Sequence, residues 1–470
     1  MPDRLEHAVT TPKYTIDKHW FRSADGRGVL AGSPLTWFGV SDGGAKVLDA
    51  LEKGHPLPTG HEPLTSRLAA SGAIHPEIVR PCLVSELTVV VPVLARTPVD
   101  VDRVQELVDS LRGPRIIVVD DCSPEEVSVV GAETFRLDAN VGPGAARNVG
   151  ARAATSPYVA FVDSDATVSL DGLTLLAGHF FDPNVVAAAA RVESADAPRL
   201  VGEYEKNESP LDLGGIPSVV RPNARVSHVP AAVLVVRADA FEELGGFDES
   251  LRTGEDVDLV WRIAESGRTV RYDPAIVAHH RPRRTVRELL RQRFSYGASA
   301  AALDVRHPQA AAPVRTNLVL AIPAFAVLLS YVFVAFAAIP VALAWFAITL
   351  RASGTSVRTR LRLGLLGIGT TIRFVASAVA RPWWPIFFAA SFVPYVGFRI
   401  GTMFLFCTVL PAIWRMVRVR PDRPFGFLVL RILDGFAYGL GVWRGAIATR
   451  NWRCLLPAVG PSSVRLRSQG

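Results

Sequence analysis

The middle of the chain alternates short apolar runs with amphipathic stretches. The apolar runs are rich in Val and Ile, as expected of buried strands, and they lie at Leu87–Val93, Arg115–Asp121, Thr134–Asp138 and Tyr158–Asp165. Amphipathic stretches at residues 101–111 and 144–154 indicate helices between them. Near-continuous apolar strands separated by helices are typical of a mainly parallel sheet that is covered on both faces. This pattern predicts an α/β domain over residues 86–300.

Beyond residue 300 the pattern changes to long apolar runs, and we expect a membrane-associated apolar helical region over residues 301–470. Residues 317–350 contain no charged side chain, whereas a single membrane span needs about 20 residues. Pro323 and Pro340 are candidate kinks in this run. Three further apolar stretches each enclose an arginine, and they lie at residues 363–380, 383–414 and 425–443. Because an arginine is costly inside a bilayer, these are either interfacial helices or spans that pack the arginine inward.

The first 81 residues show a third pattern, with short apolar runs broken by Gly and Pro. Ser41 and Asp42 can cap a helix that ends at Gly54, and a second short helix is expected over residues 63–74. Short strands followed by two helices indicate a small winged-helix-like domain at residues 1–81. Such a module either recognises a substrate or a partner protein, or is a structural cap. Its aromatic residues form either a peptide-holding set beside a strand edge or the core of the module, and they are Trp20, Phe21, Trp37 and Phe38.

Composition and charge narrow the class of protein. The chain has 470 residues with a mean hydropathy of +0.25, which excludes a disordered chain and favours membrane contact. Residues 1–280 carry a net charge of −14 and residues 281–470 a net charge of +21, with every basic residue of the second part an arginine. Arginines between apolar runs favour anionic lipid as a partner and argue against nucleic acid. Four scattered cysteines exclude a disulfide scaffold and a zinc ribbon.

The N-terminus adds an expectation about location. Residues 1–20 are polar and contain no apolar core of a signal peptide. We therefore expect everything before the first membrane segment to stay in the cytoplasm, with the protein held at the cell membrane.

Acidic side chains follow two of the predicted strands. In open α/β sheets, ligands bind beyond the carboxyl ends of the strands. Asp120 and Asp121 end one strand, where they can accept hydrogen bonds from a nucleoside or cap the following turn. Asp163 and Asp165 end another, and two carboxylates one residue apart can hold Mg²⁺ or Mn²⁺ against a diphosphate. A solvated turn is the alternative for this second pair.

Further candidate residues follow along the chain. Arg147 and Asn148 lie in the first turns of a helix that follows the glycine-rich segment "NVGPG". Glu255 and Asp256 begin another helix, where a carboxylate either serves as a general base for a sugar hydroxyl or merely complements the helix dipole. Two pairs of alternatives remain at the end of this region. His279 or His280 is either a metal ligand or a surface residue, and Gln292 and Arg293 either reach a diphosphate or face lipid.

Taken in order, these motifs resemble those of the family 2 glycosyltransferases of the GT-A fold. The resemblance covers residues 87–299 and is carried by "VVVPV", "VVDDCSPE", "NVGPGAARNVG", "FVDSDA", "GGFDE", "GEDVDL" and "AHHRP". It implies Asp256 as the base, with Glu255 beside it, and a metal held by Asp163, Asp165 and His279 or His280. It also implies a nucleotide-sugar site formed by Pro92, Asp120, Asp121, Arg147, Asn148, Asp163, Gln292 and Arg293. The Gln-x-x-Arg-Trp motif of processive synthases is absent, and "RQRFSYG" stands near its place.

The layout of the whole chain resembles a narrower group, the glycosyltransferases of mycofactocin biosynthesis. That resemblance implies an inverting transfer of glucose, in β-1,4 linkage, from a UDP-sugar to a peptide-derived redox cofactor precursor. It also implies membrane lipid and proteins of the same pathway as partners. The alternative is a polyprenyl-phosphate or lipid-linked glycan glycosyltransferase, which explains the apolar tail but gives the N-terminal module no role. A non-catalytic membrane scaffold is disfavoured by the retained acidic pairs.

Overall fold

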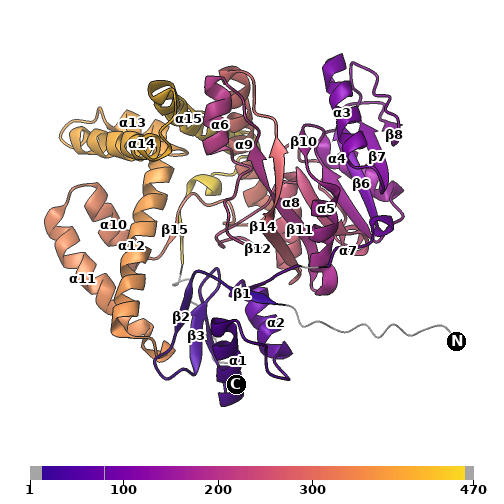
Figure 1. Cartoon of the computed structure of the whole chain (residues 1–470). Coiled ribbons are helices and arrows are strands. Elements are labelled where there is room, and N and C mark those ends of the chain that lie inside the picture. The colour runs from indigo at the N-terminus through magenta and orange to yellow at the C-terminus, as the bar shows by residue number, and fades with distance from the viewer. Residues whose placement is uncertain (1–12, 79, 461–470) are drawn as a thin grey trace.

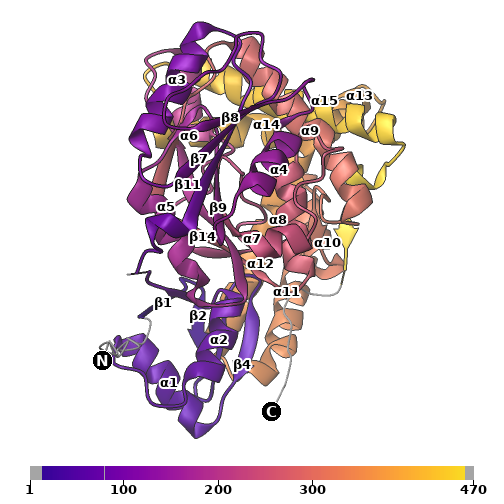
Figure 2. The ribbon, with the colours of Figure 1, turned by 90° about the vertical axis from the view of Figure 1, so that its right-hand side faces the viewer.

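The computed structural model describes residues 13–78 and 80–460. A small N-terminal module lies below a central α/β sheet, and helices from the C-terminal third lie beside both (Figure 1). The view turned by 90° shows the strands of the central sheet edge-on between their covering helices (Figure 2). Expectations that concern residues 1–12 and 461–470, including most of the segment tested for a signal peptide, lie outside the described residues.

The N-terminal module contains two short sheets and two helices. Its elements are β1 (Tyr14–Ile16), β2 (Trp20–Arg22), β3 (Gly28–Ala31), β4 (Thr36–Gly39), α1 (Asp42–Lys53), α2 (Glu62–Ser71) and β5 (Ile74–Pro76). Strands β2, β3 and β4 form an antiparallel sheet, and β1 pairs with β5. The Ser41 side chain accepts a hydrogen bond from the Gly44 amide, and Gly54 ends α1 in the left-handed conformation. Both helices expected from the sequence are therefore present.

The central sheet has the strand order β10-β14-β11-β13-β9-β6-β7-β8, and β12 pairs with β14 at one end. The strands are β6 (Leu87–Val93), β7 (Arg115–Asp120), β8 (Glu133–Arg136), β9 (Tyr158–Val162), β10 (Ala166–Thr167), β11 (Val185–Ser194), β12 (Ser218–Val220), β13 (Val233–Arg237) and β14 (Thr269–His280). Strands β6 to β9 are parallel as expected, but β13 is antiparallel to both β9 and β11. The sheet is therefore mixed, but most of its strands run in one direction, as expected. β11 and β14 are parallel to each other and, across β13, to β9, whereas β10, β12 and β13 run the opposite way.

The path of the chain explains the reversed direction of β13 and also the position of residues 227–232. The loop after β12 carries the chain back to the carboxyl end of β9, where Val233 of β13 pairs with Val162. β13 then has to run in the opposite direction to β9. Because of this return, residues 227–232 lie at the same sheet edge as the strand-end acids.

Helices cover both faces of the sheet. They are α3 (Pro98–Ser110), α4 (Pro143–Ala153), α5 (Leu170–Gly178), α6 (Leu200–Glu208), α7 (Ala238–Glu243), α8 (Glu255–Glu265) and α9 (Val286–Arg306). Alternate residues of β6 point to opposite faces: Val89 and Val91 belong to one buried apolar cluster and Val90 to the other. This burial on both sides explains why the strands are almost continuously apolar.

The C-terminal third is helical. It contains β15 (Arg315–Thr316), α10 (Leu318–Leu328), α11 (Val332–Thr349), α12 (Val357–Ala380), α13 (Trp384–Ala390), α14 (Gly397–Val419), α15 (Pro424–Thr449) and β16 (Ala458–Val459). Four of these helices, α11, α12, α14 and α15, are long and apolar enough to cross a membrane. The uncharged run is interrupted at Ser330, which has a positive φ of 58°, while Pro323 and Pro340 lie inside helices. The run is thus two helices joined by a turn.

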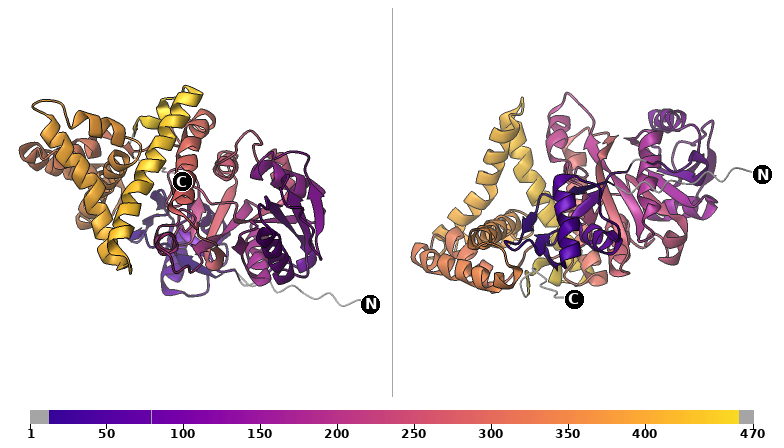
Figure 3. Two further views of the ribbon diagram at one scale, coloured as in Figure 1. Left: turned by 90° about the horizontal axis from the view of Figure 1, so that it is seen from above. Right: turned by 60° about the horizontal axis from the view of Figure 1, so that its bottom comes forward.

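Helix α15 is joined to the central α/β domain. It packs lengthwise against α9, as the view from above shows (Figure 3). The two backbones are so close that a Cβ atom added to Gly441 would overlap the carbonyl oxygen of Phe294. Asp434 of α15 is buried and accepts hydrogen bonds from Arg293 (3.0 Å) and from the Tyr204 hydroxyl (2.9 Å). A carboxylate in an apolar helix is therefore neutralised by partners on α6 and α9 rather than exposed to lipid.

The N-terminal module is docked by arginines of the central domain. The Arg225 guanidinium binds both oxygens of the buried Asp17 carboxylate at 2.8 Å. Arg271 and Arg221 donate to the carbonyl groups of Ala69 and Ser71, at the C-terminal end of α2 where the helix dipole favours cations. The module is thus held to the central domain by specific polar contacts.

The aromatic residues of the module are packed. Phe38 is buried in the core of the module and Trp20 packs against that core. Phe21 and Trp37 instead pack against an apolar cluster of the C-terminal helices that includes Phe346. The structure therefore favours a core and interface role for these aromatic side chains over an exposed peptide-holding set.

Candidate active site

A cavity of about 850 Å³ lies at the carboxyl-end edge of the sheet. Many of the residues singled out from the sequence line it: Pro92, Asp121, Arg147, Asp163, Asp165, Glu255, Asp256, His280 and Arg293. Asp120, Asn148, Gln292 and His279 do not line it. The site is thus formed by separate parts of the sequence, namely the ends of β7, β9 and β14 and the start of α8.

Asp165 and His280 form a pair in this cavity. Asp165 Oδ2 lies 3.1 Å from His280 Nε2, and Ala166 of β10 pairs with His280 in the sheet. Burial alone would raise the pKa of Asp165, but the hydrogen bond from His280 outweighs it and lowers that pKa; the same contact raises the pKa of His280 against the effect of burial. Since successive residues of a strand face opposite sides, His279 is exposed on the other side of β14. Of the two histidines, His280 is the one beside the acids.

Arg147 connects two acids of the cavity. Its guanidinium donates to Asp163 Oδ1 at 2.6 Å and to Glu255 Oε1 at 2.9 Å, and the side chain is buried. Burial would lower the pKa of Arg147, but the two carboxylates raise it. Burial and the neighbouring Asp256 raise the pKa of Glu255 to about 7, and the contact with Arg147 offsets part of that rise. Arg147 therefore remains a cation between Asp163, which follows β9, and Glu255, which begins α8.

Asp256 is held differently from Glu255. Its oxygens accept hydrogen bonds only from backbone amides, those of Val257 (2.8 Å) and Ala231 (3.4 Å), within the described residues. Burial raises the pKa of the Asp256 carboxyl. Because no side-chain cation is bound to Asp256, its carboxylate has lone pairs available toward the cavity. Of the two acids at the start of α8, Asp256 is the better placed to accept a proton.

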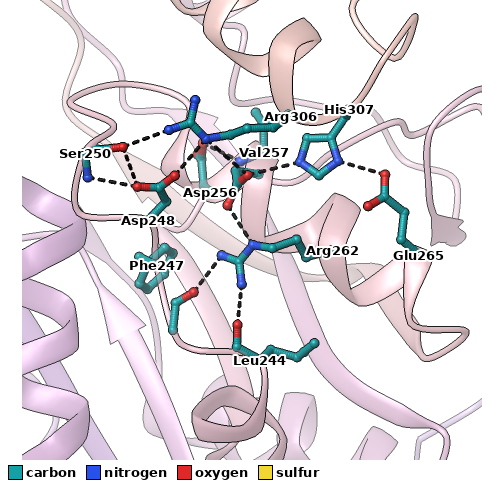
Figure 4. Close-up of polar contacts among 12 residues, drawn as sticks. Leu244, Phe247, Asp248, Ser250, Asp256, Val257, Arg262, Glu265, Arg306 and His307 are labelled. Atoms are coloured by element: carbon teal, nitrogen blue, oxygen red, sulfur yellow. Dashed lines mark hydrogen bonds and ion pairs between the residues drawn. The ribbon is translucent and has the colours of Figure 1, made fainter.

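The start of α8 is fixed by a polar network that the sequence analysis missed (Figure 4). Arg262 binds Asp258 Oδ2 at 2.8 Å and donates to the carbonyl groups of Leu244 and Gly246, both at 2.6 Å. His307 lies between Asp258 (3.0 Å) and Glu265 (2.7 Å). The four-residue spacing of Asp258 and Arg262 was a visible signal in the sequence. The other contacts join residues far apart in the chain.

The same network holds the turn "GGFDES". Arg306 of α9 binds Asp248 at 2.7 Å and the Ser250 hydroxyl at 2.7 Å. From the other side, Asn148 accepts from the Phe247 amide and donates to the Phe247 carbonyl, both at 2.9 Å. Asn148 was expected to bind the nucleotide-sugar, but its amide is used to fix this turn. The position of this segment, which precedes α8, sets where Glu255 and Asp256 lie.

The two acids at the end of β7 have different surroundings. Asp121 lines the cavity and accepts from the amides of Val141 (2.7 Å) and Gly142 (2.9 Å), which shapes the glycine-rich loop. Asp120 is buried below it and binds Arg136 at 2.6 Å and the Ser123 amide at 2.8 Å. The structure thus brings Asp121 to the site and gives Asp120 a supporting role, contrary to the expectation that both contact the nucleoside.

Gln292 and Arg293 are also used within the protein. The Gln292 amide donates to the Tyr296 hydroxyl (3.0 Å) and accepts from Arg293 (2.8 Å). Arg293 lines the cavity, but it is almost fully buried and binds Asp434 and Glu205. Neither side chain is free to reach a diphosphate in this arrangement. Arg293 instead binds α15 through Asp434, and Gln292 binds Arg293.

The residues around Asp163 and Asp165 suit a divalent cation by type. Two carboxylates and the His280 imidazole are ligands that Mn²⁺ accepts, and Mg²⁺ commonly takes one or two carboxylates with substrate phosphate and water. In residues 13–78 and 80–460 no three such groups form a ready-made cage, because Asp163 faces Arg147. The donor set fits a cation that is shared with a substrate, provided that Arg147 releases Asp163.

Comparisons with known proteins find both a family model and relatives for this chain. The model of the glycosyl transferase family 2 matches residues 88–243. The pre-mycofactocin glycosyltransferase of Mycobacterium tuberculosis (strain ATCC 25618 / H37Rv) is 33% identical over 478 residues, which cover 94% of this chain and 97% of the relative. The succinoglycan biosynthesis protein ExoO of Rhizobium meliloti is 28% identical over 176 residues, 34% of this chain and 50% of that protein.

Solved structures are more distant. GalNAc-T7 with UDP, GalNAc and Mn²⁺ is 14% identical, with a TM-score of 0.34 over 51% of this chain and 52% of that one. S. aureus TarS 1–349 is 18% identical, with a TM-score of 0.34 over 47% of this chain and 64% of that one. The family model and the near full-length relative decide the family: the chain belongs to the family 2 glycosyltransferases.

Proposed function

We propose that this glycosyltransferase moves glucose from UDP-glucose to pre-mycofactocin and its glycosylated forms, in β-1,4 linkage and with inversion at the anomeric carbon. The acceptor is suggested by the name of the Mycobacterium tuberculosis relative, which matches nearly the whole chain. One structural observation carries the chemistry: Asp256, free of any side-chain cation among the described residues, lies in the same cavity as Asp163 and Asp165.

Inversion in a single displacement needs one base and no covalent intermediate. Asp256 would take the proton of the acceptor hydroxyl while that oxygen attacks the anomeric carbon opposite the leaving UDP. The backbone amides of Val257 and Ala231 keep the carboxylate oriented, and the network of Arg262 and Arg306 keeps α8 in place. A raised pKa makes Asp256 a stronger base than an exposed aspartate.

The donor half of the cavity would bind the nucleotide-sugar. Asp121 and Pro92 line the part next to β6 and β7, and Arg147 lines the same cavity, where it binds Asp163 and Glu255. Asp163, Asp165 and His280 would hold Mg²⁺ or Mn²⁺, which when bound neutralises charge on the leaving diphosphate. Arg147, once released from Asp163, can donate to the same diphosphate and add to that stabilisation.

We further propose that the C-terminal helices hold the enzyme at the cytoplasmic face of the cell membrane. Their surface exposes large apolar side chains that soluble proteins rarely group together, among them Phe333, Phe336, Phe392, Phe398 and Phe425. The arginines in the same region suit anionic lipid headgroups. The aromatic contacts of the N-terminal module with these helices support a position of the module next to the membrane as well.

Lipid-linked acceptors are the second candidate function. The observation that favours them is Tyr438 of the apolar helix α15, which lines the catalytic cavity itself. Purified full-length enzyme incubated with UDP-sugars and either pre-mycofactocin or polyprenyl phosphate separates the two. Mass spectrometry of a product heavier by one or more hexoses on pre-mycofactocin supports the first proposal, whereas hexose found only in the lipid fraction refutes it in favour of the second.

A further inference from the structure

One wall of the catalytic cavity comes from the C-terminal helices. Arg381 follows α12 and Tyr438 lies on α15, and both line the cavity that holds Asp163 and Asp256. Strands β6 to β8 lie at one end of the sheet, and α15 lies beyond α9 toward the other end (Figure 1). This wall therefore lies on the other side of the cavity from Pro92 and Asp121, which are proposed to bind the nucleotide-sugar at the ends of β6 and β7. That leaves the wall next to the space open to an acceptor.

Arg381 and Tyr438 are fixed to each other. The guanidinium carbon of Arg381 lies 4.6 Å from the centre of the Tyr438 ring, and Nη2 is 3.7 Å from Asp434 Oδ1. The backbones are also in contact, since a Cβ atom added to Gly439 would overlap the Arg381 carbonyl oxygen. A pair held from three sides needs little further ordering when a ligand binds.

The pair has hydrogen-bonding capacity that the described part of the protein does not use. Arg381 Nε is buried without a partner there, and the Tyr438 hydroxyl has no hydrogen bond there either. The Arg381 side chain is nevertheless 38% exposed. Around the pair the wall is apolar, because Tyr438 packs with Ala300 and Ala311, which line the same cavity. A cation beside an aromatic ring in an apolar wall suits a ligand that presents an apolar group and an oxygen acceptor.

We propose that Arg381 and Tyr438 form an acceptor subsite of this glycosyltransferase. An apolar group of the acceptor rests against Tyr438 and its alanine neighbours, and a carbonyl, carboxylate or phosphate oxygen of the acceptor accepts a hydrogen bond from Arg381. The C-terminal helices then select the acceptor in addition to binding the membrane. The inference rests on the proposed transferase function but on neither of the two candidate acceptors in particular.

The test compares variants of the full-length enzyme. Arg381→Met is expected to raise the acceptor KM at least about tenfold, the size of one charge-assisted hydrogen bond, with kcat changed much less. Arg381→Lys should recover part of that loss, and Tyr438→Leu, which removes the ring, should also raise the acceptor KM. The dissociation constant for UDP, measured by calorimetry, should stay within about twofold because the donor half is untouched.

A matched control is available in the same region. Arg399 also lies over a tyrosine ring, that of Tyr331 at 5.0 Å, but neither residue lines the cavity. Arg399→Met should therefore leave the acceptor KM unchanged. An unchanged acceptor KM in Arg381→Met overturns the subsite, and so does an equal weakening of UDP binding, which would show a purely structural role. If the wild-type enzyme uses polyprenyl phosphate instead of pre-mycofactocin, the proposed function fails, and the same KM comparison on the lipid acceptor still decides the subsite.

Discussion

Replacing Asp256 by Asn is the most direct test of the mechanism. The substitution keeps the size and shape of the side chain, and the amide oxygen can still accept from the Val257 backbone amide. The contact with Ala231 is long, at 3.4 Å, so its loss costs little. The fold and the donor site should therefore survive while the proton acceptor disappears.

The expected loss is large. A positioned base contributes typically about 10²–10⁴ in rate, which corresponds to about 2.7–5.4 kcal/mol of transition-state stabilisation. The loss should fall on kcat, with the dissociation constant for UDP unchanged. The pH dependence gives a second readout, because the wild-type rate rises with pH as Asp256 loses its proton. Burial raises the pKa of Asp256, so this rise should lie above the usual range of an aspartate and should vanish in Asp256→Asn.

Glu255→Gln is the matched comparison. Glu255 binds Arg147 and carries a pKa raised to about 7, so its removal should disturb the position of Arg147 more than the chemical step. The reasoning is refuted if Asp256→Asn turns over at the wild-type rate. It is also refuted if the rise in rate is centred near pH 7 and disappears in Glu255→Gln but not in Asp256→Asn, since the two acids would then have exchanged roles.

Three further predictions concern the metal, the N-terminal module and the membrane. EDTA and Asp165→Asn should each abolish transfer, with Mn²⁺ or Mg²⁺ restoring only the chelated wild type; full activity in chelator would exclude the metal. Asp17→Asn should lower the free energy of unfolding by about 3 kcal/mol, the low end of the range for a buried pair, because Asp17 is fully buried while the Arg225 side chain stays 18% exposed. Asp49→Asn at an exposed pair should cost less than about 1 kcal/mol. Hydrogen bonds from Arg225 and His75 outweigh burial and lower the pKa of Asp17, so this stabilisation is present above about pH 4 and is lost as the pH falls further; an equal gap between wild type and variant in strong acid would contradict it. The protein should stay in the membrane pellet after carbonate extraction, and protease added to intact cells should leave the catalytic part uncut; release by carbonate or external cleavage would argue against the proposed location.

Local patterns in the sequence determined the elements and most of the candidate chemistry. Strand β6 begins and ends where the apolar run does, and Ser41 and Gly54 bound α1 as their side-chain and backbone preferences require. The strand-end position of Asp163 and Asp165 predicted a common site, and these acids do line one cavity with Glu255 and Asp256. Such signals are local, since they depend on neighbours within a few residues.

Tertiary structure alone decided how the candidates are used. The choice of His280 over His279 follows from the pairing of β14 with β10, and the difference between Asp256 and Glu255 follows from Arg147, 108 residues away from Glu255 in sequence. Arg293 was expected at a diphosphate but is bound by Asp434 of α15, a partner 141 residues away. Composition and periodicity record which side chains are buried, whereas ion pairs depend on which distant elements pack together. That is why the sequence by itself predicted which acidic residues share a site. It predicted neither the ion pairs of those residues nor the cavity wall that the C-terminal helices contribute.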